Sequence, residues 1–170
     1  MENKAEKWIR QLGLAPIAEG GWCVRNYTSQ QQIGEGEEKR PIGSCICYLL
    51  EGRERSCFHV LESDEIWFFH GGDPFELYSL WPDGSMKRTV LGPDPEAGQT
   101  LQVVYPAGVI FGGRVLGEYG LAGCFVSPAF EDKRFRLTPR SELLRRFPQH
   151  AEVICALTQE DETQPERAES

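Results

Sequence analysis

The residues best suited to chemistry lie in one run, residues 57–74, which is rich in aromatic and β-branched side chains. Within it, His59 and Glu65 stand six positions apart. A neutral imidazole can accept a proton near neutral pH, and a nearby carboxylate can orient it or raise its pKa. The same two side chains could instead hold a metal ion or form a structural hydrogen bond. We expect both to face the mouth of a β-barrel, on one strand face unless a turn near residues 61–63 separates them.

Three further side chains are candidates for ligand binding. Trp67 shares a strand face with Glu65, so it either lines a pocket or packs in the core. Glu19 and Arg25 flank a glycine pair at the entry to a predicted strand. An arginine at a barrel mouth suits the phosphate or carboxylate of a ligand, because its guanidinium donates two parallel hydrogen bonds. The alternative for Glu19 and Arg25 is an ion pair at a subunit edge.

These candidates require a β framework to position them. Short runs of aromatic and β-branched residues, separated by turn residues, predict nine strands. Their ranges are 22–28, 43–50, 55–60, 64–69, 74–81, 86–91, 100–105, 108–112 and 119–127. Residues 82–85, Pro-Asp-Gly-Ser, indicate a hairpin turn, and the polar segment 30–40 is expected to be a mobile loop. Many short antiparallel strands are typical of a jelly-roll or closed barrel.

Helices are predicted only at the two ends of the chain. Residues 3–13 form an amphipathic pattern with Asn3 as the capping residue. Thr138 followed by Pro139 predicts a helix start, with Thr138 as the cap, and this helix ends near Phe147. A second helix is expected over residues 149–157. The class is therefore mainly β, with an N-terminal helix and C-terminal helices.

Composition predicts one soluble domain, residues 1–158, followed by an acidic disordered tail, residues 159–170. Hydrophobic residues make up 40% and charged residues 26% of the 170, and the formal net charge is −8. The chain has no basic stripe, so nucleic acid is not an expected partner. It also has no apolar run near the roughly 18 residues that span a bilayer, and no apolar signal region at its start. We therefore expect no membrane partner, a cytoplasmic location, and six cysteines that remain reduced.

Several blocks, taken in order, carry a resemblance to a known family. They are Glu19-Gly20-Gly21 with Arg25, Tyr48-Leu49-Leu50, Phe58-His59, Ser63-Asp64-Glu65-Ile66-Trp67, Gly72-Asp73-Pro74, Pro106-Ala107-Gly108 with Phe111-Gly112, Gly123-Cys124, Ser127-Pro128-Ala129-Phe130 and Phe147-Pro148-Gln149-His150. Over residues 5–157 the chain resembles the cupin superfamily, and within it a small single-domain family of unknown function. The resemblance implies a double-stranded β-helix barrel, a homodimer, and similarity to epimerases that act on deoxy-sugar nucleotides.

The resemblance also bears on metal binding. Metal-binding cupins use the motifs His-x-His-x(3,4)-Glu and Pro-x-Gly-x-x-His. His59 and Glu65 match the first histidine and the glutamate, but Leu61 and Phe111 replace the other two histidines. A catalytic metal usually needs about three protein ligands. We therefore expect no metal and no other cofactor, with Phe111 lining the pocket instead of a metal ligand.

Similarity to sugar epimerases implies an acidic hydroxyl on the far face of the ligand ring. Tyr48, Tyr105 and Tyr119 are the candidates, and we take Tyr105 as the catalytic one and Tyr48 as a ligand-binding residue. The resulting hypothesis is a barrel that binds a small polar or sugar-like ligand. It acts as a metal-independent isomerase or epimerase with His59 as the base. The alternatives are a non-catalytic small-molecule binding protein and a metalloenzyme with an incomplete site at His59 and Glu65.

Overall fold

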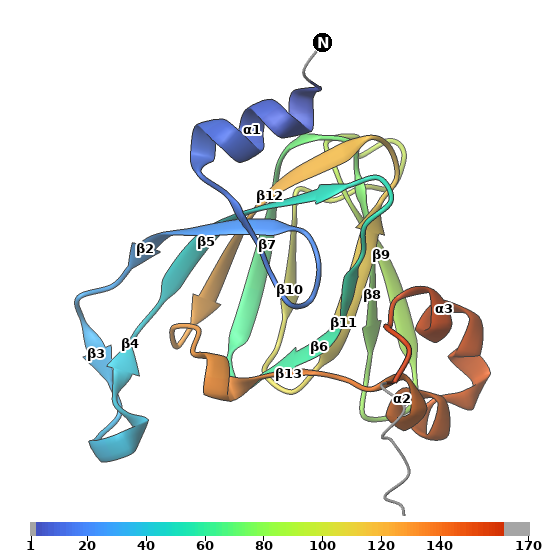
Figure 1. Cartoon of the computed structure of the whole chain (residues 1–170). Helices are drawn as coiled ribbons and strands as arrows, with labels where there is room; N and C mark the ends of the chain where they lie inside the picture. The colour runs from blue at the N-terminus through green and yellow to red at the C-terminus, as the bar shows by residue number, and fades with distance from the viewer. Residues whose placement is uncertain (1–2, 162–170) are drawn as a thin grey trace, which may run out of the picture.

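Two antiparallel sheets face each other across one core in the computed structural model, which describes residues 3–161 (Figure 1). The first sheet has six strands in the order β1-β2-β5-β12-β7-β10. The second has five strands in the order β13-β6-β11-β8-β9. Consecutive strands such as β6 and β7 lie in different sheets, as they do in a jelly roll. The predicted fold class is confirmed.

The elements have the following bounds. The first sheet contains β1 (Ala15–Pro16), β2 (Trp22–Thr28), β5 (Ser44–Glu51), β12 (Tyr119–Ser127), β7 (Asp64–Gly72) and β10 (Gln102–Tyr105). The second contains β13 (Phe135–Leu137), β6 (Ser56–Leu61), β11 (Ile110–Val115), β8 (Phe75–Leu80) and β9 (Met86–Leu91). A separate hairpin is made by β3 (Gln32–Ile33) and β4 (Arg40–Pro41). The helices are α1 (Lys4–Leu12), α2 (Arg140–Arg146) and α3 (Ala151–Ala156), with the 3₁₀ helices η1 (Gly36–Glu38), η2 (Asp132–Arg134) and η3 (Pro148–His150).

Most strands follow the predicted ranges closely. Strands β2, β9 and β12 have the predicted bounds, and the other six predicted strands shift by one to three residues at their ends. The three residues of β13 are too few to give an alternating pattern, so this strand was not predicted. The segment 30–40, expected to be a loop, contains most of the β3–β4 hairpin and η1.

The core between the sheets is unusually aromatic. Inward-facing side chains alternate along each strand with outward-facing ones, so Trp67 is buried while its neighbours are only partly so. Tyr105 stacks on Phe111 with ring centroids 4.1 Å apart. Trp67 meets Tyr48 and Phe75 edge to face at 5.1 and 5.8 Å. Such geometry adds to the stabilisation that comes from burying the rings.

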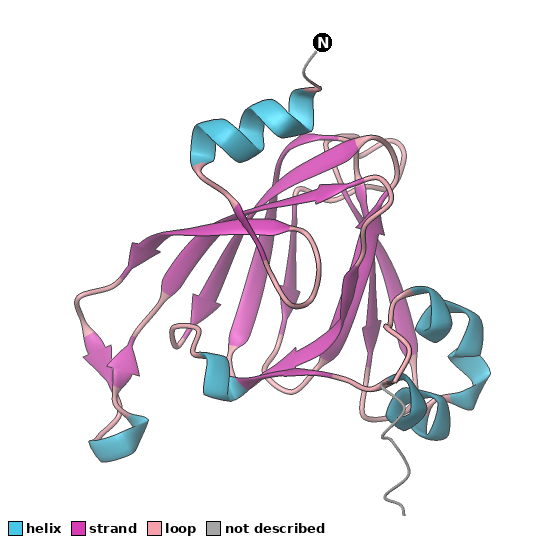
Figure 2. Ribbon diagram, in the orientation of Figure 1, coloured by secondary structure: helices cyan, strands magenta, loops and turns pink. Residues whose placement is uncertain are grey.

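Helices cover the outer faces of both sheets (Figure 2). Helix α1 packs Ala5 and its apolar neighbours against Leu49 and Leu121 of the first sheet. Helices α2 and α3 place Leu143 and Ile154 against apolar side chains of the second sheet. Asn3 and Glu6 form the capping box that begins α1, which confirms Asn3 as the cap. None of the helices within residues 3–161 is long and apolar enough to cross a membrane.

The start of α2 differs from the prediction. Thr138 is buried and its hydroxyl has no hydrogen-bond partner within the described residues, so Thr138 as the cap is wrong. The Asp161 carboxylate instead accepts hydrogen bonds from the backbone N–H groups of Arg140 and Ser141, at 2.9 and 3.0 Å. A cap supplied from 20 residues downstream has no local sequence signature. Residues 162–170 of the expected tail lie outside the described residues.

Candidate functional site

A cavity of about 360 Å³ opens at one end of the barrel, between the two sheets. Its lining comes from β2, β5, β6, β7, β12 and β13 and from the segments next to β2 and β13. The lining residues are Ile17, Ala18, Glu19, Cys23, Arg25, Ser44, Ile46, His59, Leu61, Glu65, Cys124, Val126, Phe130, Asp132 and Phe135. Apolar side chains dominate, and a few polar groups converge among them. That composition is typical of a small-molecule site.

His59 and Glu65 line this cavity from opposite walls. His59 is on β6 of the second sheet and Glu65 is on β7 of the first. The chain crosses between the sheets at Glu62 and Ser63, so the two side chains are not neighbours on one strand. Both point inward and are only 3% and 6% exposed. The turn that the sequence left open is therefore present, and it places the two groups on different sheets that line the same cavity.

The His59 imidazole is held in one tautomer. Its Nδ1 atom lies 2.7 Å from the backbone carbonyl oxygen of Cys57. A carbonyl oxygen can only accept, so Nδ1 carries the hydrogen and Nε2 keeps the lone pair. The ring packs edge to face on Phe111 at 4.3 Å and lies 5.4 Å from the Phe135 ring. The backbone and these rings orient His59.

Burial lowers the pKa of His59 to about 4, although the hydrogen bond to Cys57 acts in the opposite direction. The expectation that Glu65 would orient His59 or raise its pKa is therefore wrong. The physical reason is that burial dominates the shift and that the opposing effect comes from the Cys57 carbonyl and not from Glu65. At neutral pH the imidazole is uncharged, with its Nε2 lone pair available.

The pKa of Glu65 is shifted in the opposite direction, upward. Burial raises its pKa to about 8, and the hydrogen bond from Trp67 only partly offsets this effect. The Trp67 indole N–H donates to Glu65 Oε1 at 2.9 Å. The Glu19 carboxylate adds repulsion, while a hydrogen bond with Cys124 favours the charged form. At neutral pH Glu65 is therefore mostly a protonated acid and can donate a proton into the cavity.

Glu19 reaches the cavity through the glycine turn that follows it. Gly21 has φ +80°, and an added Cβ atom would lie 2.7 Å from the Leu49 carbonyl oxygen, so only glycine fits this turn. The Glu19 carbonyl oxygen accepts a hydrogen bond from the Cys57 N–H at 2.7 Å. Burial raises the pKa of Glu19, and repulsion from Asp132 adds to this shift.

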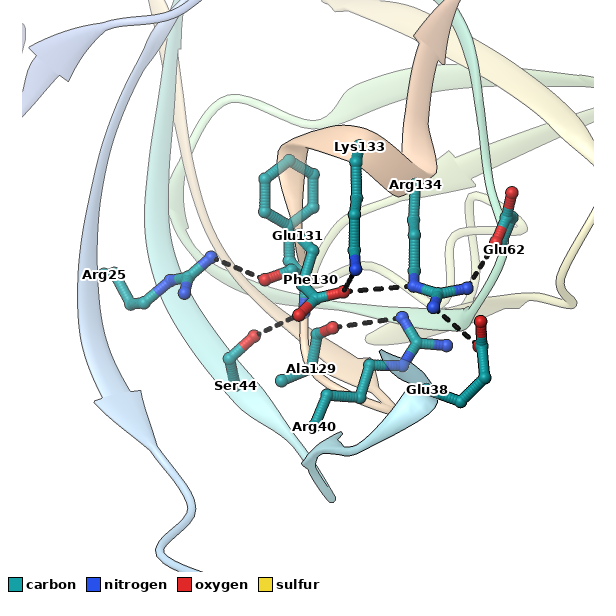
Figure 3. A network of polar contacts seen from close by, with 10 residues as sticks. All are labelled: Arg25, Glu38, Arg40, Ser44, Glu62, Ala129, Phe130, Glu131, Lys133 and Arg134. Atoms are coloured by element: carbon teal, nitrogen blue, oxygen red, sulfur yellow. Dashed lines mark hydrogen bonds and ion pairs between the residues drawn. The ribbon is translucent and has the colours of Figure 1, made fainter. Parts of the chain in front are cut away.

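Arg25 lies at the rim, beside Phe130 (Figure 3). Its Nη2 atom donates to the Phe130 carbonyl oxygen at 3.1 Å, and its guanidinium carbon is 5.6 Å from the centre of the Phe130 ring. Asp132 adds a third carboxyl side chain to the lining, beside Glu19 and Glu65. Sequence reasoning missed Phe130, Asp132 and Phe135 as lining residues. Only the block Ser127–Phe130 was noted, and nothing local indicated that it folds over the site.

Four of the sequence candidates lie beside the cavity and do not line it. Tyr48 donates its hydroxyl hydrogen to the Gly20 carbonyl oxygen at 2.8 Å. Trp67 holds Glu65, and Phe111 supports the His59 ring. Tyr105 stacks on Phe111, and its hydroxyl has no hydrogen-bond partner within the part of the chain that the structure describes. Burial raises the pKa of Tyr105, and repulsion from Glu65 adds to it.

The donor set does not fit a metal held by side chains. Leu61 lines the cavity and Phe111 lies behind His59, and neither side chain can coordinate an ion. Among residues 3–161, no group of three histidine, cysteine, aspartate or glutamate side chains is placed to hold one. The polar groups of the cavity are therefore better suited to donating and accepting protons than to holding a metal.

Comparisons with known proteins give a consistent result. A family model described as "Cupin superfamily (DUF985)" matches residues 6–138. The chain is similar to a protein of known structure from Shewanella oneidensis, with 34% identity, 95% of this chain and 100% of that one covered, and a TM-score of 0.87. A hypothetical protein from Leishmania major gives 31% identity, 93% and 100% coverage, and a TM-score of 0.86.

More distant similarity concerns the fold alone. Oxalate decarboxylase from Bacillus subtilis shares 12% identity, with 86% of this chain and 38% of that chain covered and a TM-score of 0.56. A search of curated proteins finds no match.

Proposed function

Because the chain belongs to the cupin superfamily, in the family described as DUF985, we propose that its barrel binds a small carbonyl compound and moves a proton on it. The activity would be that of a metal-independent isomerase or epimerase. The observation that carries the proposal is the pair of buried groups on opposite walls, one a neutral base and the other a protonated acid at neutral pH. Titratable groups whose surroundings drive their pKa values apart are a usual mark of acid–base catalysis.

The proposed reaction passes through an enol of the ligand. His59 Nε2 takes the proton from a carbon next to the ligand's carbonyl, so the C–H bond breaks and an N–H bond forms. Glu65 gives its proton to the carbonyl oxygen, which yields a neutral enol and a carboxylate. His59 then returns the proton to the neighbouring carbon, and the Glu65 carboxylate takes the proton of the enol hydroxyl that becomes the new carbonyl, so both groups recover their starting states. The apolar walls exclude water and strengthen both proton transfers.

The cavity limits the ligand's size and charge. Its volume of about 360 Å³ suits one small molecule. Arg25 at the rim suits an anionic group, such as a phosphate or carboxylate, that would extend out of the cavity. A phosphorylated keto-sugar fits this description, and the nucleotide of a sugar nucleotide would lie outside the barrel. The mainly apolar lining also suits small hydroxy-ketones with a methyl group.

The first prediction is that deuterium from D₂O enters a carbon next to the carbonyl of keto-sugars incubated with the protein. His59→Gln is expected to slow this exchange by about 100-fold or more, because a positioned base contributes on that order. Proton NMR or mass spectrometry of the ligand measures it. His70→Gln is the matched control, since His70 is exposed and does not line the cavity.

Glu65→Gln keeps the side chain neutral but removes its transferable proton, and it should lose exchange as well. Chelators should leave exchange unchanged, and chelator-sensitive activity would favour a metalloenzyme. Equal rates in wild type and His59→Gln would contradict the proposed base.

A second function, non-catalytic binding, has one specific observation in its favour. A pKa of about 4 makes His59 a weak base at neutral pH. The test is a panel of sugar phosphates and keto acids. Compounds that raise the melting temperature of the protein but take up no deuterium at their carbons would favour this function. A ligand that binds and also exchanges its proton would support the enzyme.

A further inference from the structure

One wall of the cavity is a single segment between the two sheets. The wall segment, residues 128–135, leaves β12 of the first sheet and enters β13 of the second. It contributes Phe130, Asp132 and Phe135 to the lining. Its only regular structure before β13 is η2. The closure of the cavity on this side therefore depends on what holds the wall segment.

Arg134, at the end of η2, contacts three carboxylates that come from different parts of the chain (Figure 3). Its Nη2 atom lies 2.6 Å from Glu38 on η1, and Nη1 lies 2.8 Å from Glu62 in the β6–β7 turn. Its Nε atom lies 3.0 Å from Glu131, within the wall segment itself. The Arg134 side chain is only 13% exposed, whereas those of Glu38 and Glu62 are 70% and 62% exposed. The planar guanidinium carries five N–H donors on three nitrogen atoms, so one arginine can donate to three separate carboxylates at once.

The contact with Glu62 connects the wall segment to the reacting groups. Glu62 lies in the turn that separates His59 from Glu65 along the chain. Its backbone N–H also donates to the Arg134 carbonyl oxygen at 3.1 Å. Side chain and backbone of Arg134 thus both attach the wall segment to the turn that places His59 opposite Glu65.

The remaining attachments of the wall segment lie near its start and at its end, where Phe135 pairs with Leu61 of β6. Arg40, which is buried, donates to the Ala129 carbonyl oxygen at 3.3 Å. The Phe130 N–H donates to Ser44 Oγ at 3.1 Å. Between these two ends, residues 131–134 are held to other parts of the chain mainly by Arg134. Ion pairs with exposed carboxylates are individually weak, so losing one arginine should release this part without unfolding the barrel.

We propose that the wall segment opens and closes the cavity and that Arg134 is its latch. By holding the β6–β7 turn, Arg134 also acts as a positioning residue for His59 and Glu65, a role that rests on the proposed function. The latch itself does not depend on catalysis.

Cysteine alkylation of the full chain tests the latch. Cys124 lines the cavity and is 1% exposed, so a reagent reaches it when the cavity opens. Cys57 is buried but does not line the cavity, and it reports more general opening. Cys155 is exposed and serves as the reference for reagent activity. Treatment with iodoacetamide, digestion and mass spectrometry give a separate rate for each thiol.

Arg134→Gln is expected to raise the rate at Cys124 by about tenfold or more, with Cys57 and Cys155 unchanged. Arg134→Lys keeps the charge but cannot reach three carboxylates from its single nitrogen. Its Cys124 alkylation rate should lie between those of Arg134→Gln and wild type. Arg136→Gln is the matched control, because Arg136 pairs with Glu142 at 2.7 Å and does not line the cavity. This variant should match wild type.

Salt provides a test that needs no variant. Added sodium chloride screens ion pairs between exposed groups, so it should raise the Cys124 rate relative to Cys57 in wild type. An unchanged Cys124 rate in Arg134→Gln, or a parallel rise at Cys57, would overturn the latch. If Arg134→Gln opens the cavity while His59→Gln leaves exchange unaffected, the latch stands and the proposed proton transfer fails.

Discussion

Burial sets the protonation states of His59 and Glu65 at the scale of single residues. His59 loses affinity for its proton and Glu65 gains it, because each is more stable uncharged in the apolar interior. Between about pH 4 and pH 8 the cavity therefore holds an uncharged base and an uncharged acid. The same shifts make folding stability depend on pH, with opposite signs for the two groups.

Glu65→Gln should remove a contribution to the free energy of unfolding that the wild type loses as the pH rises. The folded-state pKa of about 8 exceeds the ordinary value of 4.5, so the native state binds more protons than the unfolded state between those values. The stabilisation from protonated Glu65 is full below about pH 4.5 and is lost as pH rises toward 8. The stability of wild type relative to Glu65→Gln should fall by up to about 1.4 kcal/mol per pH unit. Urea denaturation at several pH values measures it.

His59→Gln provides the opposite control. The folded-state pKa of about 4 lies below the ordinary 6.5, so the His59 contribution is full above 6.5 and is lost as pH falls toward 4. The stability of wild type relative to His59→Gln should therefore rise as the pH increases from about 4 to 6.5. A difference that stays flat with pH for either variant would mean that the corresponding side chain is well hydrated.

The arrangement of the site is decided at the scale of elements. Strands β6 and β7 follow each other in sequence but belong to different sheets, which places their inward side chains on opposite walls. The wall segment closes one side, and the turn at Gly20 and Gly21 brings Glu19 to another. The α-helices take no part in the lining, since α1, α2 and α3 pack on the outer faces of the sheets.

Leu143→Ala should therefore affect stability and not the site. Leu143 is fully buried between α2 and the second sheet, so its truncation should cost about 2–5 kcal/mol. Urea denaturation measures the loss, and Leu144→Ala, at a half-buried neighbour, should cost less. The alkylation rate of Cys124 should stay at the wild-type value under native conditions. A selective rise at Cys124 would indicate that α2 also supports the cavity.

On the scale of the whole molecule, the barrel keeps one end open while helices cover its sides. Large apolar side chains remain exposed outside the cavity, among them Tyr27 at 54% and Ile33 at 51%. These lie on β2 and on the β3–β4 hairpin, away from the helices. The homodimer that the cupin resemblance implies would give such side chains a place to be buried.

We therefore predict that the chain sediments at twice the mass of one chain in the micromolar range. Sedimentation equilibrium measures this mass directly. Tyr27→Ser should shift the equilibrium toward single chains if β2 takes part in the interface. A single-chain mass at all concentrations would contradict the dimer.

Much of the framework was predictable because its signals are local. The alternation and turn residues around β2, β9 and β12 specified their bounds, and Asn3 with Glu6 specified the start of α1. Local sequence signals failed at the start of α2, where the capping group comes from a distant part of the chain. Thr138 has the chemistry of a cap, yet the carboxylate of the remote Asp161 accepts the hydrogen bonds from the first N–H groups of α2.

The sequence alone determined the mainly β class, the approximate ranges of nine strands, and His59 and Glu65 as the residues to consider, since these depend on residue type and short-range pattern. Only the tertiary structure decided that the pair face each other from two sheets and that burial makes both neutral. It also decided that Arg134 ties the wall segment to the turn between them. The physical reason is that desolvation and ion pairing depend on groups that are distant in sequence: Arg134 meets Glu38 and Glu62 across 96 and 72 positions.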